Sequence, residues 1–276
     1  MLLMEFGQLA EELGLPVALK IASPDITHKS DVGGVRLWAP RRFVANYVGR
    51  EYEPGLTRLL RETLREGAVV IDAGAHVGYL SILMAREVGA AGRVFAIEPS
   101  LENVDFLRRN LAANQVTNVS VLPVALTSRP GLVSFHLNES SDSYGLFDHP
   151  NTPTTSIEIV PAMSLDALFG GFDLDRLDLI KIDTEGAEIE VLQGMVWLRE
   201  RFPVTPIVVE WFPAAYVNRG LDGDALPRHL ESLGLSLDVL DPSGGGPGTV
   251  AAAAQELAER RLPTHWYCNL VARPSS

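Results

Sequence analysis

A buried strand that runs into a glycine-rich turn and then into a helix is the feature that most constrains this chain. Residues 69–79 read VVIDAGAHVGY, and residues 93–99 read RVFAIEP. The second stretch predicts another buried strand, which ends in the carboxylate of Glu98. Glycines let the backbone approach a ligand closely, and a carboxylate at the end of the next strand can accept hydrogen bonds from both ribose hydroxyls. The two stretches therefore predict a nucleoside-bearing cofactor at the edge of a parallel sheet.

The spacing of the glycines distinguishes between two such cofactors. A dinucleotide fold usually shows G-x-G-x-x-G, because the pyrophosphate sits on backbone N–H groups at a helix start. Here Asp72 is followed by Gly74 and Gly78, and His76 takes the place of the middle glycine. An acid at that point repels a pyrophosphate and suits the ammonium and sulfonium of S-adenosylmethionine. We therefore expect the methyl donor; the alternatives are a nicotinamide-dependent oxidoreductase on the same fold and a strand–turn–helix without a ligand.

The composition narrows the class of protein. The chain has 276 residues, of which 46% are hydrophobic and 21% are charged, as in an ordinary globular protein. A net charge of −12 argues against a nucleic-acid groove and against docking on anionic membranes. The chain shows neither a membrane-length apolar run nor a secretion signal, and the lone Cys268 excludes an internal disulfide or a cysteine-rich zinc site. We expect a cytoplasmic enzyme that acts on a small molecule.

Strands and helices alternate over most of the chain, which predicts an α/β fold with a doubly wound, mostly parallel sheet of seven strands. Residues 41–65 precede this alternation and predict a helical segment that is interrupted at residues 52–55. The expected strands cover residues 68–72, 93–97, 119–124, 177–182, 206–209, 235–240 and 266–271, and the expected helices include residues 79–88, 101–114 and 250–260.

One region breaks the alternation. Residues 131–137 and 156–160 predict two paired strands, joined by a segment rich in Ser, Asp, Asn and Pro over residues 138–155. Functional residues concentrate on loops that a rigid frame holds, so this β-hairpin insertion is a natural substrate lid. The alternative is an inert surface hairpin.

A second set of acids follows another predicted strand. Residues 178–188 read DLIKIDTEGAE, which places Asp183, Glu185 and Glu188 after a buried run, and Glu210 ends the next strand. Ligands of a doubly wound sheet sit at the carboxyl ends of its strands. Several carboxylates around one cleft can supply a general base or hold a divalent metal. For Glu188 an acid in the first turn of a helix is also explained by the helix dipole alone.

Together these motifs resemble the FkbM family of S-adenosylmethionine-dependent methyltransferases. The matching stretches are residues 70–79, 94–99, 180–188 and 209–211, in the family's order, and the resemblance covers about residues 41–273. It implies a Rossmann-like class I methyltransferase fold and methylation of hydroxyl oxygens on sugars, polyketides and related natural products. His76 departs from the pattern, since the family more often has Asn there.

The N-terminal segment falls outside this resemblance. Residues 16–35, with Lys20 in a predicted strand over 17–21 and Lys29 behind it, resemble part of the ATP-grasp domain of ADP-forming acyl-CoA synthetases. In that family the lysine of the first strand contacts ATP, but the metal-binding carboxylates of such a site are not visible downstream. We interpret residues 1–40 as an N-terminal extension, which could mediate a homodimer, and residues 41–276 as the methyltransferase domain. Nucleotide binding through Lys20 is the alternative.

The expected cofactor site follows the first two motifs. Asp72 and the loop from Gly74 to Gly78 would hold the methionine moiety, Glu98 would hold the ribose, and Ala125 would flank the adenine. The full set of expected cofactor contacts is Asp72, Ala73, Gly74, Ala75, His76, Gly78, Tyr79, Glu98, Pro99, Ser100, Asn103, Ala125 and Asp183.

The expected acceptor side follows the later acids. Asp183, Glu185 and Glu210 would line it, and one of them would act as general base or metal ligand. Glu185 ranks first, because it lies just beyond the strand end and could point into the cleft. His149 in the insertion and His76 are alternative bases.

Overall fold

The computed structural model describes residues 17–21, 35–40, 52–139, 143–240 and 246–275. Seven strands of this part form one sheet in the order β11-β12-β10-β9-β3-β4-β5. Strands β5, β4, β3, β9 and β10 are parallel, and β12 runs antiparallel to both of its neighbours. The predicted, mostly parallel sheet is confirmed. The strands are β3 Val69–Ala73, β4 Arg93–Ile97, β5 Val119–Leu122, β9 Leu179–Ile182, β10 Ile207–Trp211, β11 Leu235–Leu240 and β12 Cys268–Pro274.

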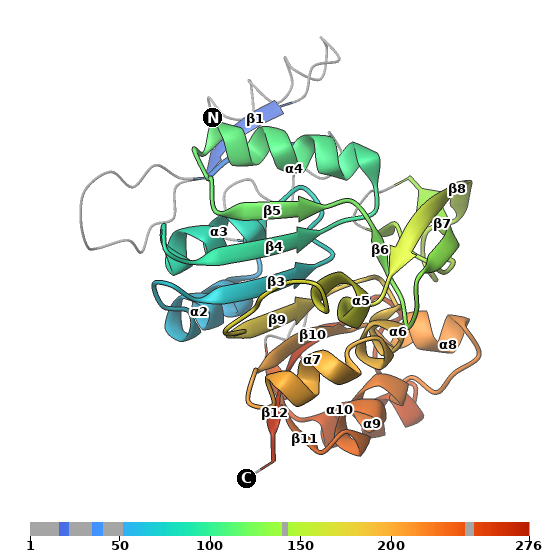
Figure 1. Ribbon diagram of the computed structural model, residues 1–276. Coiled ribbons are helices and arrows are strands. Elements are labelled where there is room, and N and C mark those ends of the chain that lie inside the picture. Colours follow the sequence, from blue (N-terminus) through green and yellow to red (C-terminus); the bar gives the residue numbers. More distant parts are fainter. Residues whose placement is uncertain (1–16, 22–34, 41–51, 140–142, 241–245, 276) are drawn as a thin grey trace.

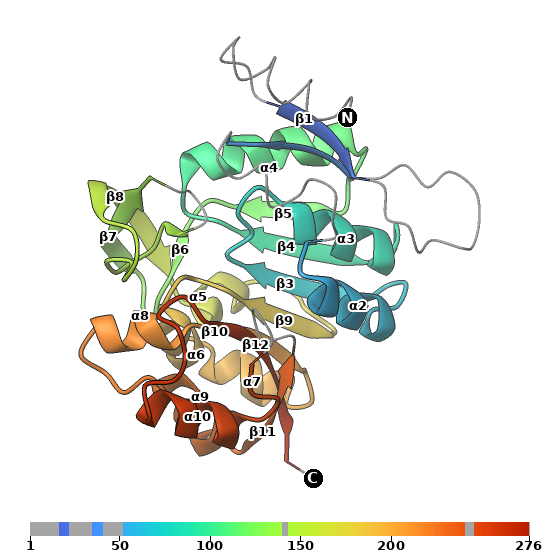
Figure 2. The ribbon, with the colours of Figure 1, turned by 180° about the vertical axis from the view of Figure 1, so that it is seen from behind.

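Helices cover both faces of the sheet, as Figures 1 and 2 show from opposite sides. Side chains alternate between the faces of a strand. Accordingly, Ile71 packs in one core with residues of α5, α6, α7, α9 and α10, while Val70 packs in another with residues of α2, α3 and α4. No helix of the described part is both long and apolar enough to span a bilayer. The helices are α2 Pro54–Thr63, α3 Tyr79–Val88, α4 Leu101–Ala113, α5 Leu165–Phe169, α6 Glu188–Gln193, α7 Val196–Arg201, α8 Pro213–Asn218, α9 Ala225–Ser232 and α10 Val250–Ala258.

The predicted element bounds differ from the structure at two places that matter for the site. The strand expected over residues 119–124 ends at Leu122, where a tight turn leads into β6, Ala125–Leu126. The strand expected over residues 206–209 continues to Trp211, because β12 pairs with its last two residues. The spacing of apolar residues over 5–13 also predicts a helix, and this segment lies outside the described residues. The part of the 41–65 prediction before residue 52 lies outside them as well.

The predicted hairpin insertion is present as β7, Gly131–Asn138, paired antiparallel with β8, Thr154–Met163. Short β6 joins β8 in parallel, and the three strands enclose a small core around Phe135. In Figure 1 the arrowheads of β3, β4 and β5 point toward this hairpin. The insertion therefore lies at the carboxyl edge of the main sheet, where a substrate lid is expected.

The described part of the N-terminal extension is a two-stranded antiparallel sheet, β1 Val17–Ile21 and β2 Val35–Ala39. Two asparagines, one within α4 and one directly after it, hold β2 through their side-chain amides. Asn110 accepts from the N–H of Trp38 at 2.5 Å and donates to its carbonyl at 2.8 Å. Asn114 makes the same pair of bonds to Arg36, at 2.9 and 2.6 Å. These amides bind the backbone of β2 as a neighbouring strand would, and they hold the hairpin against the C-terminal half of α4.

Candidate cofactor and acceptor site

The glycine-rich turn between β3 and α3 packs tightly against the protein itself. Gly74 has φ +78°, and a Cβ there would lie 1.7 Å from the carbonyl oxygen of Asp183. A Cβ on Gly78, at φ +86°, would lie 2.1 Å from Leu107 Cδ1. The missing side chains of these glycines thus permit close packing against Asp183, which follows β9, and against α4; contact of the turn with a ligand stays a prediction. His76 has φ +48°, a left-handed conformation in which asparagine is enriched, which explains the family's usual residue there.

The N–H groups of this turn bear directly on the choice of cofactor. Gly74 and Ala75 both donate to the carbonyl of Ile97, at 2.9 and 3.0 Å. His76 donates its N–H to Glu98 Oε2 at 2.9 Å. A pyrophosphate site needs such donors to point at the ligand, and these three are held by the protein. The structure therefore argues against the nicotinamide alternative.

Glu98 has the geometry of a ribose-binding carboxylate. Its Oε1 accepts from the N–H of Ser100 at 2.9 Å and from the Asn103 amide at 3.3 Å, and its Oε2 accepts from His76. A carboxylate offers about four lone-pair positions, so Oε2 retains one for a hydroxyl. Burial raises the pKa of Glu98 to about 7, although the hydrogen bonds from Ser100, Asn103 and His76 oppose the shift. The residues at this strand end fit the nucleoside of S-adenosylmethionine.

This pKa predicts that cofactor affinity depends on pH. An ionised Glu98 accepts hydrogen bonds from ribose hydroxyls, and a protonated one must first lose its proton. Affinity is therefore highest above a pH of about 7 and falls as the pH drops through that value. Titration calorimetry with S-adenosylhomocysteine should show a Kd about tenfold higher at pH 6 than at pH 8. In Glu98→Gln, which cannot titrate, the remaining binding should be nearly independent of pH, and an unchanged pH dependence would contradict this assignment.

Lys181 is a buried cation that joins the two sequence motifs. Its Nζ donates to the carbonyl of Gly74 at 2.9 Å and lies 3.1 Å from Asp183 Oδ2 and 3.5 Å from Asp72 Oδ1. Burial opposes its charge, but the carboxylates of Asp183 and Asp72 outweigh burial and raise the pKa of Lys181. Asp72 is fully buried and accepts from Ser81 Oγ at 2.5 Å. Asp72 and Lys181 thus fix the turn from within; contact of Asp72 with the methionine moiety stays a prediction.

Three carboxylates meet beside Lys181, and we call Glu53, Asp183 and Glu210 the carboxylate cluster. One oxygen from each lies within 4.8 Å of the others. Glu53 immediately precedes α2 and accepts from Asn269 Nδ2 at 3.2 Å. Burial and the charge of Asp183 raise the pKa of Glu53 to about 7. Burial, with the charges of Asp183 and Glu185, also raises the pKa of Glu210 well above its usual range. The cluster can therefore hold a proton at neutral pH.

Sequence reasoning predicted two members of this cluster and missed Glu53. The residue stands before Pro54 and Gly55, a stretch that the sequence predicts only as a break in a helix. In the structure Glu53 has φ +44°. This left-handed conformation is uncommon for a glutamate, and it marks the residue as one that its surroundings hold in place. No pattern in the sequence pairs Glu53 with strands more than 100 residues away.

Glu188 has a structural role. Its Oε1 accepts from the N–H groups of Thr184 and Gly186 at 2.9 and 3.0 Å, and its Oε2 accepts from the Tyr216 hydroxyl at 2.5 Å. These bonds close the turn before α6, which agrees with the helix-start interpretation. Glu185 lies in that turn, is half-buried and has φ +53°.

The two histidines considered as bases are differently placed. The His149 ring stacks on Phe212, with centroids 5.5 Å apart, and its Nδ1 accepts from the N–H of Asn151 at 3.3 Å. Burial and the Lys181 ammonium lower the pKa of His76 to about 3, which makes that imidazole a weak base. The carboxylates are the better candidates.

The remaining expected cofactor contacts are partly engaged within the protein. Ala125 is buried and packs in the small core of the insertion with Phe135. Tyr79 is buried, and its ring packs edge-on against Tyr52 with centroids 5.6 Å apart. Ala73 and Pro99 lie at the ends of β3 and β4, at the predicted edge. Contact of these residues with the cofactor stays a prediction.

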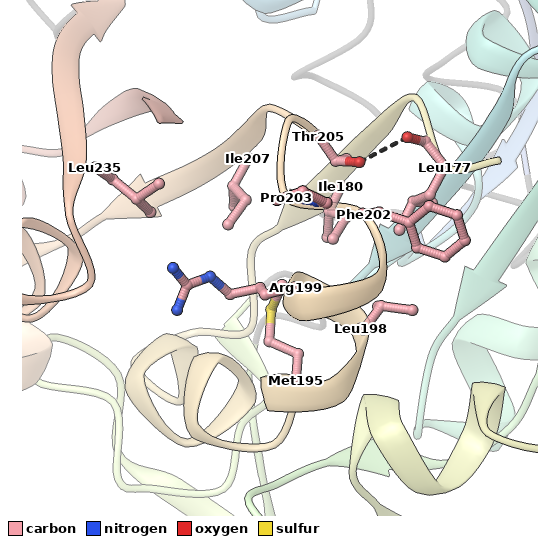
Figure 3. A pocket seen from close by; sticks show the side chains of 10 residues that line it. All are labelled: Leu177, Ile180, Met195, Leu198, Arg199, Phe202, Pro203, Thr205, Ile207 and Leu235. Carbon is pink, nitrogen blue, oxygen red and sulfur yellow. Dashed lines mark hydrogen bonds between the residues drawn. The ribbon is translucent and has the colours of Figure 1, made fainter. Parts of the chain in front are cut away.

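A small cavity of about 70 Å³ lies at the other end of the sheet. Figure 3 shows its mostly apolar lining, where Thr205 Oγ1 donates to the carbonyl of Leu177 at 2.6 Å. The lining includes Ile207 and Leu235, the first residues of β10 and β11. Ligands of this fold bind at the carboxyl ends of the strands, so this cavity is a packing gap away from the chemistry.

The strand order, with its single antiparallel strand, and the Glu98 site define an S-adenosylmethionine-dependent methyltransferase of class I. The methyltransferase FkbM domain matches residues 72–234, and the chain belongs to that family. Methyltransferase sdnD from Sordaria araneosa is 28% identical over 186 residues, which cover 52% of this chain and 67% of that protein. Hexuronic acid methyltransferase AglP from Haloferax volcanii is 28% identical over 187 residues, covering 68% of this chain and 71% of that protein.

Among solved structures, the precorrin-6y C5,15-methyltransferase of Geobacter metallireducens superposes with a TM-score of 0.46 at 16% identity, covering 80% of this chain and 88% of that one.

The N-terminal extension is similar to a different family of proteins. An ATP-grasp domain matches residues 3–40. An ADP-forming acetate–CoA ligase from Archaeoglobus fulgidus is 61% identical over 33 residues, which are 12% of this chain and 5% of the ligase. The predicted resemblance is confirmed, and it is confined to this segment.

Proposed function

We propose that this protein transfers a methyl group from S-adenosylmethionine to a hydroxyl oxygen of a sugar or a related small natural product. The observation that carries the proposal is the carboxylate cluster, which stands at the same sheet edge as Glu98. An alcohol oxygen becomes a good nucleophile only as its proton leaves, so a positioned base is required. The similarity to a methyltransferase named for hexuronic acid supports a sugar-like acceptor.

The residues divide between holding the cofactor and activating the acceptor. When bound, S-adenosylmethionine supplies an electrophilic methyl group. Glu98 binds the ribose, and the turn that Asp72 and Lys181 fix sets the depth at which the cofactor lies. Glu185, Asp183 and Glu210 face the acceptor side, and one of them takes the hydroxyl proton. Asp183 Oδ2 lies 3.1 Å from Lys181 Nζ, so this carboxylate is already engaged in an ion pair within the protein. Glu185 and Glu210 are therefore the stronger candidates.

The carboxyl groups of this side can bind a hydroxylated acceptor by hydrogen bonds. The pKa values of Glu53 and Glu210 are raised, so these groups can stay protonated near neutral pH, and Asp183 is paired with Lys181. The polar insertion that lies at this edge supplies further hydrogen-bonding groups. We therefore expect an acceptor that is rich in hydroxyl groups.

A divalent cation is an alternative way to activate the hydroxyl. Glu53, Asp183 and Glu210 would hold it, because oxygen ligands suit such ions. Dialysis against EDTA separates the two routes. Loss of turnover that Mg²⁺ restores would assign the cluster to a metal, and unchanged turnover would assign the proton to a protein carboxylate.

The test of the proposed function has two stages. Calorimetry should detect micromolar binding of S-adenosylmethionine and S-adenosylhomocysteine, with NAD as the control that does not bind. The protein is then incubated with the methyl donor and a panel of neutral sugars, hexuronic acids and polyketide alcohols, and products are followed by mass spectrometry. A mass gain of one methyl group on a neutral sugar supports the proposal. Transfer only to an amine, thiol or carboxylate would contradict it.

A further inference from the structure

Arg219, which directly follows α8, contacts two segments that border the acceptor side. We call residues 183–186 the acidic turn and residues 143–153 the insertion loop. The Arg219 guanidinium donates to the carbonyl of Gly186, in the acidic turn, and pairs with Glu190 of α6. Its central carbon lies 3.7 Å from the centre of the Phe147 ring, in the insertion loop. A single, largely buried cation therefore joins the two segments.

The insertion loop and the acidic turn also touch each other directly. A Cβ on Gly145 would lie 3.2 Å from the carbonyl oxygen of Glu185 and 3.3 Å from its Cβ. The loop backbone therefore rests against the residue that ranks first as the base. The short helix α8 fixes the same loop, since Asn218 Nδ2 donates to the carbonyl of Asp148 at 2.8 Å. Figures 1 and 2 both show α8 beside the β7–β8 hairpin.

The acidic turn needs such support because of its backbone. Glu185 has φ +53° and Gly186 has φ +93°. A left-handed conformation costs a residue other than glycine about 1 kcal/mol, and it persists only where the surroundings determine it. Glu188 binds the N–H groups of the turn from one side, and Arg219 binds the Gly186 carbonyl from the other. Together they leave the Glu185 backbone little freedom.

We propose that Arg219 is a positioning residue for methyl transfer. With Phe147 it fixes the insertion loop over the acidic turn, and it thereby orients Glu185 toward the acceptor. Arg219 contacts the insertion loop through its cation–π contact with Phe147, because its hydrogen bonds go to Gly186 and Glu190. We call these contacts of Arg219 with Phe147 and with the Gly186 carbonyl the latch. Its role in catalysis rests on the proposed function, whereas the contacts themselves do not depend on it.

Hydrogen–deuterium exchange of the full chain tests the latch. Phe147→Leu and Arg219→Ala are each expected to speed exchange at least tenfold in both the insertion loop and the acidic turn, with β3 and β4 unchanged. Phe147→Tyr keeps the aromatic face, so exchange in both segments should stay as slow as in the unmodified protein. Arg219→Lys keeps the charge beside Glu190 but loses the planar stack, so it should release the loop even if Arg219→Ala folds poorly. Arg228→Ala, at an exposed pair with Asp222, is the matched control without effect.

The double variant of Phe147 and Arg219 gives the sharpest comparison. One shared interaction predicts that the double variant exchanges no faster than Arg219→Ala alone, which already removes the contact with Phe147. Unchanged exchange in Phe147→Leu, or release of the loop without the acidic turn, would overturn the latch. Titration of the same samples with S-adenosylhomocysteine tests the proposed function separately from the latch. Lack of binding by the unmodified protein would contradict the proposed function, and it would not alter the exchange result.

Discussion

Glu98→Ala is expected to raise the Kd for S-adenosylhomocysteine at least about 100-fold. The loss combines two effects. The ribose hydroxyls lose their acceptor, and the N–H groups of His76 and Ser100 lose the carboxylate that they now share. A hydrogen bond to a charged group contributes about 1.5–3 kcal/mol, and the two effects together exceed the 2.7 kcal/mol or so that corresponds to 100-fold. Titration calorimetry with the purified variant measures the change.

The matched control for this prediction is Glu102→Ala. Glu102 is an exposed acid in the first turn of α4, four residues after Glu98, so its removal changes the net charge equally. We expect its Kd to stay within about threefold of the unmodified protein, because an exposed charge on a helix surface contributes little. If Glu98→Ala bound S-adenosylhomocysteine as tightly as this control, Glu98 would not be the residue that binds the ribose.

Glu185→Gln is expected to lower turnover by about 10²–10⁴, the usual contribution of a general base. Glutamine keeps the size of the side chain and cannot accept the hydroxyl proton. Binding of S-adenosylhomocysteine should stay within about threefold, because our proposal places Glu185 on the acceptor side. The acceptor identified by the product screen is used at saturating concentration, so that kcat and KM are separated.

The corresponding variants of the carboxylate cluster decide whether Glu185 is the base. Glu210→Gln and Glu53→Gln each remove a carboxylate near Glu185, and we expect a smaller loss of kcat from each. The pH profile of kcat should also shift, because burial and the neighbouring Asp183 raise the pKa values of Glu53 and Glu210. Full activity in Glu185→Gln together with loss in Glu210→Gln would transfer the role to Glu210. Full activity in all three would argue against a base at these positions and against a metal held by the cluster, and it would leave Asp183 as the remaining candidate.

The local elements of this fold could be predicted because their signals are local. Continuous apolar runs predict strands that are buried on both faces, and the glycines before α3 and the serine cap of α4 mark where helices begin. The acids at strand ends could be predicted for the same reason, since parallel strands bring their carboxyl ends to one edge. The seventh strand shows the limit, because its predicted range of 266–271 becomes Cys268–Pro274 only through pairing with β10 and β11.

By itself, the sequence determined the order of strands and helices and the strand ends at which the acids stand, because periodicity and motif spacing act over a few residues. The tertiary structure alone decided which of these groups touch. The Glu53 contact with Asn269 spans 216 positions of the chain, and the Lys181 contact with Gly74 spans 107. Such contacts form only when distant strands pack side by side. Packing also gave Gly74 a role that its motif does not predict, since the Asp183 carbonyl fills the space that a side chain would occupy.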